Sequence, residues 1–497
     1  MKLNEVIKNI PCELITGSLT VDIKGISEDS RRISPGWLFV AREGLETNGH
    51  LYIENAINRG AAAVILSDKS YVVSGGTPIV AMDMSQNNLG LLAGNFYGTP
   101  KCKLIGITGT NGKTTTCYLT RHFLEKIGVA TGIIGTVAYE FKGRCIPAKR
   151  TTPDIFELNR IIKQMSESGA EVVIMEVSSH ALAQNRIGNL EYDVAVFTNL
   201  SRDHLDYHQT MEKYFAAKRK LFDKLKKNES DQHGKAVISL DDQWGRKMSG
   251  EILESGFAVI TYSSADESKA TVQAKNIVAS TSGTSFDLIV EGNKIADAKI
   301  PLIGRHNVSN CLAAMTIAHL FGAEVETMIK QATTLPAVSG RLEFISNNLG
   351  FLVVVDYAHT DDALNKTLHC LKELNPEKLS VVFGCGGDRD KGKRAKMGKA
   401  AENNADFIVI TNDNPRTENP DVIIEDIVAG LNKEKFIIEK DRHKAIELTI
   451  KNAGENDIVL IAGKGHETYQ EINRVYHHFD DREIARNVIA ELEKSNV

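Results

Sequence analysis

Short apolar runs alternate with longer stretches of helical periodicity over most of the chain. Residues 103–108 form one such run, and from Lys113 to Ile127 the apolar positions recur at the spacing of one helix face. Further apolar runs follow at 172–177, 194–198 and 236–240, and the gaps between them leave room for crossover helices. The pattern predicts an α/β domain with a mostly parallel sheet.

The pattern changes on either side of this domain. A β-rich stretch at about 257–300 and a helix at 307–320 lead to a linker at 335–343. A second alternating series then predicts another doubly wound unit, with strands at 351–356, 380–384, 407–411, 435–438 and 457–462. Before residue 99, a helix at 53–60 leads into a strand at 61–66. We therefore expect three domains, at 1–98, 99–334 and 335–497, with a variable loop at 228–234.

Composition narrows the class of protein. With 42% hydrophobic and 25% charged residues, the chain can bury several cores, and its net charge of -5 offers no extended basic surface for nucleic acid. Its seven cysteines form no CxxC pair, which indicates reduced thiols in the cytoplasm. The first residues lack the apolar core of a secretory signal, and no apolar run reaches 18 residues. We expect a cytoplasmic protein that binds neither nucleic acid nor membrane.

The sharpest motif lies between the strand at 103–108 and the helix that follows it. Gly109-Thr110-Asn111-Gly112-Lys113-Thr114-Thr115 resembles a phosphate-binding loop, although the strict motif needs glycine where this chain has Ile107. Backbone N–H groups and the helix N-terminus can hold phosphates, Lys113 can neutralise them, and Thr114 can reach Mg²⁺. A plain glycine turn that begins a helix is the alternative.

Polar residues also follow the other central strands. Glu176 ends one strand and is a candidate Mg²⁺ ligand, while a solvated loop carboxylate is the alternative. The segment 199–208 contains two His and two Asp, which suits metal or phosphate chemistry as well as an ordinary polar loop. Lys218, on a predicted helix among other basic residues, is interpreted from its position alone as a solvated lysine.

Three loops follow strands in the C-terminal series, at 384–390, 413–416 and 463–467. They combine glycines with Arg and acidic residues at the carboxyl ends of strands. Arginine pairs bidentately with carboxylates, and acidic groups hold ammonium. Each loop alone also fits an ordinary turn, but together they predict a pocket for a small zwitterion.

The ordered motifs strongly resemble the Mur ligase family over essentially the whole chain. They are DSRRISPGWLFVA (29–41), GTNGKTTT (109–116), TTP (151–153), EVSSHAL (176–182), NLSRDHLDYH (199–208), AKRKLF (217–222), GRHNVSN (304–310), SGRLE (339–343), DYAH (356–359), GGDRDKGKR (386–394), DNPR (413–416) and AGKGHE (462–467). The resemblance implies a UDP-precursor-binding domain, a central ATPase and a C-terminal Rossmann-like domain that brings the amino acid.

The resemblance also implies a reaction. The ligase would use ATP and Mg²⁺ to add meso-diaminopimelate to UDP-N-acetylmuramoyl-L-alanyl-D-glutamate, through an acyl phosphate, in peptidoglycan precursor synthesis. We expect a monomer. Asp361 stands where relatives usually have proline, a departure that concerns the local turn and leaves the catalytic residues unchanged.

The family's functional residues carry over position by position. The implied ATP-binding residues are Gly109, Thr110, Asn111, Gly112, Lys113, Thr114, Thr115, Asn307, Arg341 and Asp356. The implied contacts to the UDP-linked precursor are Ser30, Thr151, Thr152, Ser178, Gln184 and Arg186, and those to diaminopimelate are Arg389, Asp413, Asn414, Pro415, Arg416, Gly463 and Glu467. Thr114, Glu176, His204 and Lys218 would serve Mg²⁺, and Lys113, His204 and a carbamylated Lys218 would be catalytic. The carbamate would reverse the solvated interpretation of Lys218.

Three alternatives remain. A lysine-adding member of the same subfamily would not need Arg416 to face a distal carboxylate. A folylpolyglutamate synthetase also makes γ-glutamyl bonds but lacks a UDP-binding first domain, so residues 1–98 argue against it. A P-loop switch protein would explain the phosphate loop alone and would leave Lys218, His204 and the C-terminal pocket without a purpose.

Overall fold

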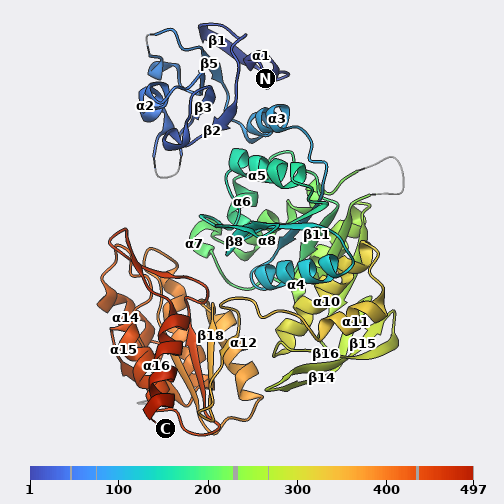
Figure 1. Ribbon diagram of the computed structural model, residues 1–497, viewed down its shortest axis with the longest axis vertical. Coiled ribbons are helices and arrows are strands. Elements are labelled where there is room, and N and C mark those ends of the chain that lie inside the picture. Colours follow the sequence, from blue (N-terminus) through green and yellow to red (C-terminus); the bar gives the residue numbers. More distant parts are fainter. Residues whose placement is uncertain (45–46, 74, 228–232, 267, 433–435, 496–497) are drawn as a thin grey trace. The chain divides into compact units, whose positions relative to one another are not determined.

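The computed structural model describes residues 1–44, 47–73, 75–227, 233–266, 268–432 and 436–495 (Figure 1). The chain divides into two compact units, each assembled from separate stretches of sequence. The first holds residues 1–106, 129–195 and 217–234, and the second holds 107–128, 196–216 and 235–497. Among the described residues, no helix is long and apolar enough to cross a membrane.

The first unit begins with a five-stranded sheet in the order β1-β5-β4-β3-β2, in which only β1 runs antiparallel to its neighbour. Alternate residues of β3 enter two different cores: Leu38 and Val40 pack on one face, and Phe39 and Ala41 on the other. Both faces are therefore covered. The elements are α1 (Leu3–Val6), β1 (Cys12–Thr16), β2 (Gly25–Ser27), β3 (Trp37–Ala41), α2 (Ile53–Asn58), β4 (Ala63–Leu66), β5 (Ile79–Met82) and α3 (Gln86–Tyr97).

An eleven-stranded sheet has the order β16-β15-β14-β13-β12-β11-β6-β10-β7-β8-β9. Strands β7 and β10 pair in parallel, whereas β8 and β9 extend this end of the sheet as antiparallel strands. The elements up to β11 are β6 (Lys103–Thr108), α4 (Lys113–Lys126), β7 (Thr131–Ile134), β8 (Ala138–Phe141), β9 (Arg144–Pro147), α5 (Ile155–Glu167), β10 (Val172–Glu176), α6 (Ser179–Ala183) and β11 (Val194–Phe197).

Within the second unit, β12 and β13 pair in parallel, and β14, β15 and β16 form an antiparallel meander. Eleven of the sixteen residues of α10 are buried, because the helix lies between α4 and strands β12 to β14. The elements that follow β11 are α7 (Leu205–His208), α8 (Met211–Arg219), β12 (Lys235–Ser239), α9 (Gln243–Glu254), β13 (Ala258–Ser263), β14 (Val272–Ser280), β15 (Gly283–Val290), β16 (Asn293–Ile300), α10 (Arg305–Leu320) and α11 (Val325–Ala332).

The C-terminal sheet has the order β17-β18-β22-β19-β20-β21, and all pairs except β17-β18 are parallel. Helices α12, α13 and α14 cover one face, and α15 and α16 cover the other. The elements are β17 (Glu343–Ile345), β18 (Leu352–Asp356), α12 (Asp361–Lys372), β19 (Leu379–Phe383), α13 (Arg394–Asn404), β20 (Phe407–Ile410), α14 (Pro420–Val428), β21 (Phe436–Ile438), α15 (Arg442–Lys451), β22 (Ile458–Ala462), β23 (Tyr469–Ile472), β24 (Val475–His478) and α16 (Asp481–Ser495).

The predicted fold class is confirmed: the chain forms three α/β domains with mostly parallel sheets. The strand predicted at 103–108 is β6, and the helix predicted from Lys113 is α4. The turn at Asp361 forms without proline, because the Thr360 hydroxyl accepts a hydrogen bond from the N–H of Ala363 and so caps α12. Residues 228–232 of the predicted variable loop, and residue 435 of the strand predicted at 435–438, lie outside the described residues.

The central strands of the C-terminal sheet generate a stability prediction. Leu460 of β22 is fully buried, so Leu460→Ala should lower the free energy of unfolding by about 2–5 kcal/mol through lost burial and a residual cavity. Leu253→Ala in α9 is the control, because Leu253 is 55% exposed. Denaturant titrations of both variants and the parent protein would measure the effect. Equal midpoints for the two variants would contradict the assignment of Leu460 to the core.

Candidate active site

The phosphate loop connects β6 to α4 and is packed too closely for larger residues at two positions. Gly109 and Gly112 have φ angles of +153° and +85°, in the region that favours glycine. A Cβ at Gly109 would lie 1.8 Å from the Thr198 hydroxyl oxygen, and one at Gly112 would lie 2.4 Å from Oδ1 of Asn310. The glycines therefore let neighbouring elements approach the loop backbone.

Side chains that follow β11 hold the loop in place. The N–H of Asn111 donates to Oδ1 of Asn199 at 3.0 Å, and the Thr198 hydroxyl donates to the carbonyl of Asn111 at 2.6 Å. Nζ of Lys113 donates to the carbonyls of Gly109 and Thr110 at 3.0 and 2.9 Å. The lysine thus lies across the loop, beside the helix N-terminus where an anion is favoured.

A cavity of about 500 Å³ opens in front of this loop. Its size suits a small-molecule ligand. Seven of the ten residues that the resemblance assigned to ATP line it: Asn111, Gly112, Thr114, Thr115, Asn307, Arg341 and Asp356. The structure therefore brings the phosphate loop together with α10 and with residues of the C-terminal sheet. Gly109, Thr110 and Lys113 lie in the loop but outside this lining.

Arg341 and Asp356 form the wall of the cavity on the side of the C-terminal sheet. The Arg341 guanidinium lies 4.4 Å above the Tyr357 ring, and its Nη2 donates to the Thr114 hydroxyl at 3.4 Å. Asp356 accepts hydrogen bonds from the N–H of Leu342 and the Thr367 hydroxyl. Burial raises the pKa of Asp356 above its usual value, although Arg341 opposes the shift.

Asp241 shapes another part of the cavity wall and was missed by the sequence analysis. Its carboxylate accepts hydrogen bonds from the hydroxyl groups of Ser263, Ser264 and Ser309, and from the N–H of Ser264. It therefore joins the ends of β12 and β13 to α10. The available signal was its place directly after the strand predicted at 236–240.

In the first unit, Glu176 lies at the carboxyl end of β10 and is 1% exposed. The N–H and hydroxyl of Thr136 donate to its two carboxylate oxygens at 2.8 and 3.0 Å. The Thr152 hydroxyl donates to the Glu176 carbonyl and accepts from the N–H of Ser178, while the hydroxyls of Thr136 and Thr151 are 3.1 Å apart. Thr151, Thr152, Glu176 and Ser178 are thus brought together. Thr136 was missed, and its position just after β7 was the only signal.

Gln184 and Arg186 belong to the same cluster. Nε and Nη2 of Arg186 donate to Oε1 of Gln184 at 2.9 and 2.6 Å, and Nη1 donates to the Thr152 carbonyl at 3.2 Å. Ser30 lies buried in the first turn after Asp29, whose side chain accepts from the N–H of Arg31. Five of the six residues assigned to the UDP-linked precursor therefore form one cluster, and Ser30 belongs to the N-terminal sheet domain.

The loop after β11 carries Asp203 and His204. His204 has a left-handed backbone (φ +54°), its N–H donates to Oδ1 of Asp203, and its Nε2 lies 3.4 Å from Oδ2. Burial would raise the pKa of Asp203, but the charges of His204, His359 and Lys393 lower it overall. The lowered pKa of Asp203 favours its carboxylate form, which lies beside the imidazole of His204.

The four residues assigned to Mg²⁺ are divided between the units: Glu176 and Lys218 lie in the first, and Thr114 and His204 in the second. Within the described ranges, no group of three or more His, Cys, Asp or Glu side chains is placed to hold a metal ion. Lys218 is only 1% exposed in α8, so its interpretation as a solvated lysine was wrong. Lysine is rarely buried this completely.

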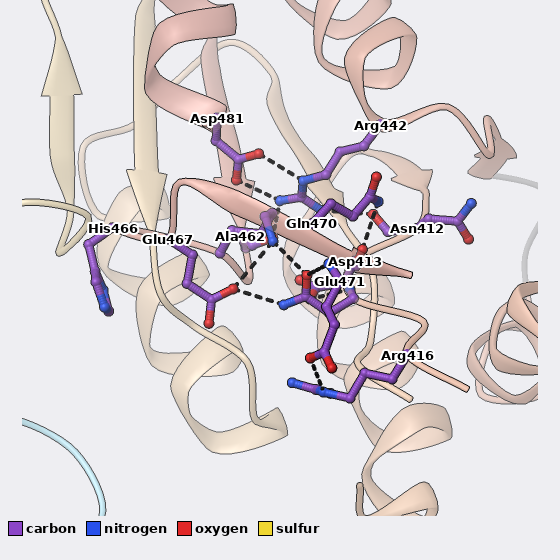
Figure 2. Close-up of polar contacts among 12 residues, drawn as sticks. Asn412, Asp413, Arg416, Arg442, Ala462, His466, Glu467, Gln470, Glu471 and Asp481 are labelled. Carbon is purple, nitrogen blue, oxygen red and sulfur yellow. Dashed lines mark hydrogen bonds and ion pairs between the residues drawn. The ribbon is translucent and has the colours of Figure 1, made fainter. Parts of the chain in front are cut away.

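The loops after β20 and β22 converge in the second unit (Figure 2). Nδ2 of Asn414 donates to Oε2 of Glu467 at 2.9 Å. Gly463 has a φ of +116°, and a Cβ there would lie 2.8 Å from Oδ2 of Asp413. Burial and the neighbouring Asp413 raise the pKa of Glu467, whereas Asp413 itself, despite its burial, has its pKa lowered by nearby cations. Two carboxylates whose pKa values are shifted in opposite directions therefore belong to one buried cluster.

Arg416 lies beside the same cluster, and its guanidinium donates hydrogen bonds to two different partners. Nε donates to Oε2 of Glu471 at 3.0 Å, and Nη1 donates to the Gly387 carbonyl at 2.7 Å. Pro415 also approaches this glycine, since a Cβ on Gly387 would lie 2.0 Å from its carbonyl oxygen. Arg389 is exposed and donates to the Asp388 carbonyl. Glu471 was missed, because its hairpin gave no distinct sequence signal.

Three family models match the chain, each over a different part. They are the Mur ligase family catalytic domain at residues 22–96, the Mur ligase middle domain at 107–318, and the Mur ligase glutamate ligase domain at 340–465. Together the three matches span most of the sequence. Each match falls in a different domain of the fold.

Homologous proteins match this chain over nearly its full length and over nearly their own. A UDP-N-acetylmuramoyl-L-alanyl-D-glutamate–2,6-diaminopimelate ligase of Caldanaerobacter subterraneus subsp. tengcongensis is 40% identical over 99% of this chain and 100% of the relative. The protein of the same name from Listeria monocytogenes is 40% identical over 98% and 99%, respectively. A solved structure with that name has 32% identity and a TM-score of 0.69 over 99% of both chains. These matches confirm the resemblance inferred from the motifs, and the chain belongs to the Mur ligase family.

Proposed function

We propose that this chain is an ATP-dependent ligase that adds meso-diaminopimelate to UDP-N-acetylmuramoyl-L-alanyl-D-glutamate during peptidoglycan precursor synthesis. The observation that carries the proposal is the 40% identity, over 99% of the chain, to a relative named for this substrate and amino acid. The cavity at the phosphate loop and the cluster of charged side chains at the ends of β20 and β22 agree with it. We also propose that the enzyme is a cytoplasmic monomer.

The reaction would proceed in two steps. The γ-carboxylate of the glutamyl residue attacks the terminal phosphorus of ATP, which gives an acyl phosphate and ADP. The amine of diaminopimelate then attacks the acyl carbon, loses a proton and displaces phosphate. Lys113 and the N–H groups of its loop would bear the charge that develops on the phosphoryl group.

We assign the remaining ATP contacts to residues that line the cavity. Asn307, Arg341 and Asp356 would hold the nucleotide, with Thr114 and Thr115 at its phosphates. As the resemblance implies, Thr114 and Glu176 would supply oxygen donors, which Mg²⁺ prefers, and His204 would add an imidazole. When bound, the ion would neutralise phosphate charge. Lys218 would join this set only as a carbamate, formed when its neutral amine adds to CO₂ and loses a proton.

The two other substrates would bind at the clusters already described. Ser30 would contact the uridine end of the precursor, and the muramoyl-peptide would bind Thr151, Thr152, Ser178, Gln184 and Arg186. Arg389, Asp413, Asn414, Pro415, Arg416, Gly463 and Glu467 would form the diaminopimelate site. Arg416 would pair with the distal carboxylate, which lysine lacks, and the acidic side chains would hold ammonium.

A folylpolyglutamate synthetase is the alternative that shares the fold. The structure of such an enzyme from Mycobacterium tuberculosis, complexed with ADP, has 18% identity and a TM-score of 0.62 over 75% of this chain. That likeness concerns the fold alone. The five-stranded N-terminal sheet and the family match at residues 22–96 favour a ligase of UDP-linked precursors.

The first prediction concerns the phosphate loop. Lys113→Ala should lower amino-acid-dependent phosphate release by about a thousandfold or more, because a charged group that acts in the transition state is lost. Lys126→Ala, at the exposed end of the same helix, is the matched control and should keep normal activity. Circular dichroism would verify that both variants fold. Near-normal phosphate release by folded Lys113→Ala protein would show that this loop is not the ATP site.

The second prediction concerns Lys218. Lys218→Ala should have very low activity that added formate or acetate partly restores, because a small carboxylate can replace the missing anionic oxygens. The neighbouring exposed lysine gives the control, Lys220→Ala, which should be active without additives. Intact-mass analysis of the native enzyme in bicarbonate should reveal the carbamate. An active enzyme with an unmodified lysine, or a variant with normal activity, would remove the carbamate from the mechanism.

The third prediction concerns the choice of amino acid. Each charge-assisted bond from Arg416 is worth roughly 1.5–3 kcal/mol, so Arg416→Ala should lower kcat/KM for diaminopimelate by about a hundredfold or more. Activity with lysine should change much less. Arg416→Lys should also be impaired, because a point charge cannot reproduce the planar fork.

Paired steady-state kinetics with both amino acids would measure these effects. Arg474→Ala, in the exposed turn of the nearby hairpin, is the control and should retain the parent preference. An equal loss with both amino acids would show that Arg416 does not read the distal carboxylate, while the ligase assignment would stand.

A further inference from the structure

Lys464 is a fully buried lysine in the amino-acid pocket, next to residues assigned to diaminopimelate but not among them. It follows β22, its side chain has no exposed surface, and its Nζ lies 5.5 Å from the centre of the Tyr469 ring. Nζ donates to Oδ1 of Asn414 at 3.0 Å and to Oε2 of Glu467 at 3.3 Å. A lysine is rarely buried unless its charge is paired, so these contacts account for its position.

Lys464 is one of two donors that set the orientation of the Asn414 amide. Oδ1 of Asn414 accepts from Lys464 and also from the N–H of Glu471 at 2.9 Å. Nδ2 is therefore turned toward the Glu467 carboxylate. Because an ammonium has donors only, it cannot accept from a flipped amide. Lys464 and the N–H of Glu471 thus act together to turn Oδ1 of Asn414 away from Glu467 and Nδ2 toward it.

A buried ion pair holds the strand ends that carry this group. Arg442 and Asp481 have no exposed side-chain surface and are joined by two hydrogen bonds of 2.8 and 2.7 Å. The same guanidinium donates to the carbonyl of Ala462 at 2.9 Å and of Asn412 at 3.4 Å (Figure 2). These carbonyls directly precede Gly463 and Asp413. The backbone at both loops is therefore anchored independently of Lys464.

Charge around Glu467 comes from several elements. Asp413 follows β20 and Arg442 lies on α15, and burial together with the Glu467 charge raises the pKa values of Tyr357 and Tyr469, whose phenols therefore stay neutral. Burial and Asp413 raise the pKa of Glu467, while Lys464 and the Asn414 amide oppose the increase. Removal of the lysine would leave two carboxylates close together with a weaker counter-charge, which favours protonation of one of them.

We propose that Lys464 is a positioning residue for the amino-acid site: its ammonium orients the Asn414 amide and keeps the Glu467 carboxylate available to the ammonium group of the substrate. The inference rests on the proposed diaminopimelate site. It adds a residue whose role is to set the polarity of that site, since an amide presented the other way would place an oxygen against a carboxylate.

The test is the pH dependence of kcat/KM for diaminopimelate in Lys464→Met, Lys464→Gln and Lys464→Arg. In the Met variant, KM for diaminopimelate should rise at least tenfold at neutral pH while KM for ATP stays within twofold. The acidic limb of the profile should move to higher pH, because a carboxylate without its cation is protonated at higher pH. A purely structural role would lower activity at every pH and leave the limb in place.

The other variants separate orientation from charge. Lys464→Gln keeps a donor for Asn414 but no charge, so the acidic limb of its pH profile should also move to higher pH. The acidic limb of Lys464→Arg should stay at the pH of the parent protein. If Lys464→Met does not fold, the Gln variant alone shows whether loss of the charge moves the acidic limb. Lys440→Met is the control and should match the parent protein, because Lys440 is exposed and follows β21 at the same edge of the sheet.

Two outcomes would overturn the inference. One is an unchanged KM and an unmoved acidic limb in folded Lys464→Met and Lys464→Gln protein, with the parent protein active on diaminopimelate. The other is an equal shift in the Lys440→Met control. If the parent protein itself releases no phosphate with diaminopimelate, the proposed function fails. The activity of the parent protein therefore distinguishes failure of the proposed function from failure of the role of Lys464.

Discussion

Parallel pairing of strands is the constraint on which the candidate chemistry of this chain depends. In a parallel sheet the carboxyl ends of neighbouring strands meet at one edge, so residues far apart in sequence become neighbours there. The phosphate loop follows β6 and Asp241 follows β12, and both line the cavity of the second unit. In the C-terminal sheet, Asp356 ends β18, and the loops that carry Asp413 and Gly463 follow β20 and β22. The eleven-stranded sheet and the six-stranded sheet thereby each supply one edge at which substrates can be held.

Close packing converts that edge into defined sites. A Cβ at Gly109 would lie 1.8 Å from a hydroxyl oxygen, and one at Gly463 would lie 2.8 Å from a carboxylate oxygen, so both positions favour glycine. Buried charges then fix the side chains: Arg442 with Asp481 anchors two strand ends, and Lys464 orients Asn414. The backbone is rigid where anions or zwitterions would bind, which is the arrangement that preorganised binding requires.

Local patterns in the sequence were sufficient for several central strands, for the C-terminal series and for the glycine-rich loop, where a strand, glycines and a lysine lie within a dozen residues. They did not predict β1, β2, β3, β5 or β7 to β9. Lys218 could not be interpreted from local patterns. Its neighbours in sequence are basic, yet its side chain is buried, and only the resemblance to a family suggested that it is not a solvated lysine. Asp241, Thr136, Glu471 and Lys464 were missed for one reason. Their partners lie on other strands or helices, so their roles depend on pairings that no local spacing encodes.

The central claim is that phosphate transfer from ATP is coupled to the addition of an amino acid with a distal carboxylate. Its most direct test is phosphate release by the unmodified enzyme, with ATP, Mg²⁺ and UDP-N-acetylmuramoyl-L-alanyl-D-glutamate, upon addition of either meso-diaminopimelate or lysine. Coupled ligation predicts rapid release with diaminopimelate, formation of the tripeptide product in equal amount, and little release with lysine. Preferred release with lysine, or release that needs no amino acid, would contradict it.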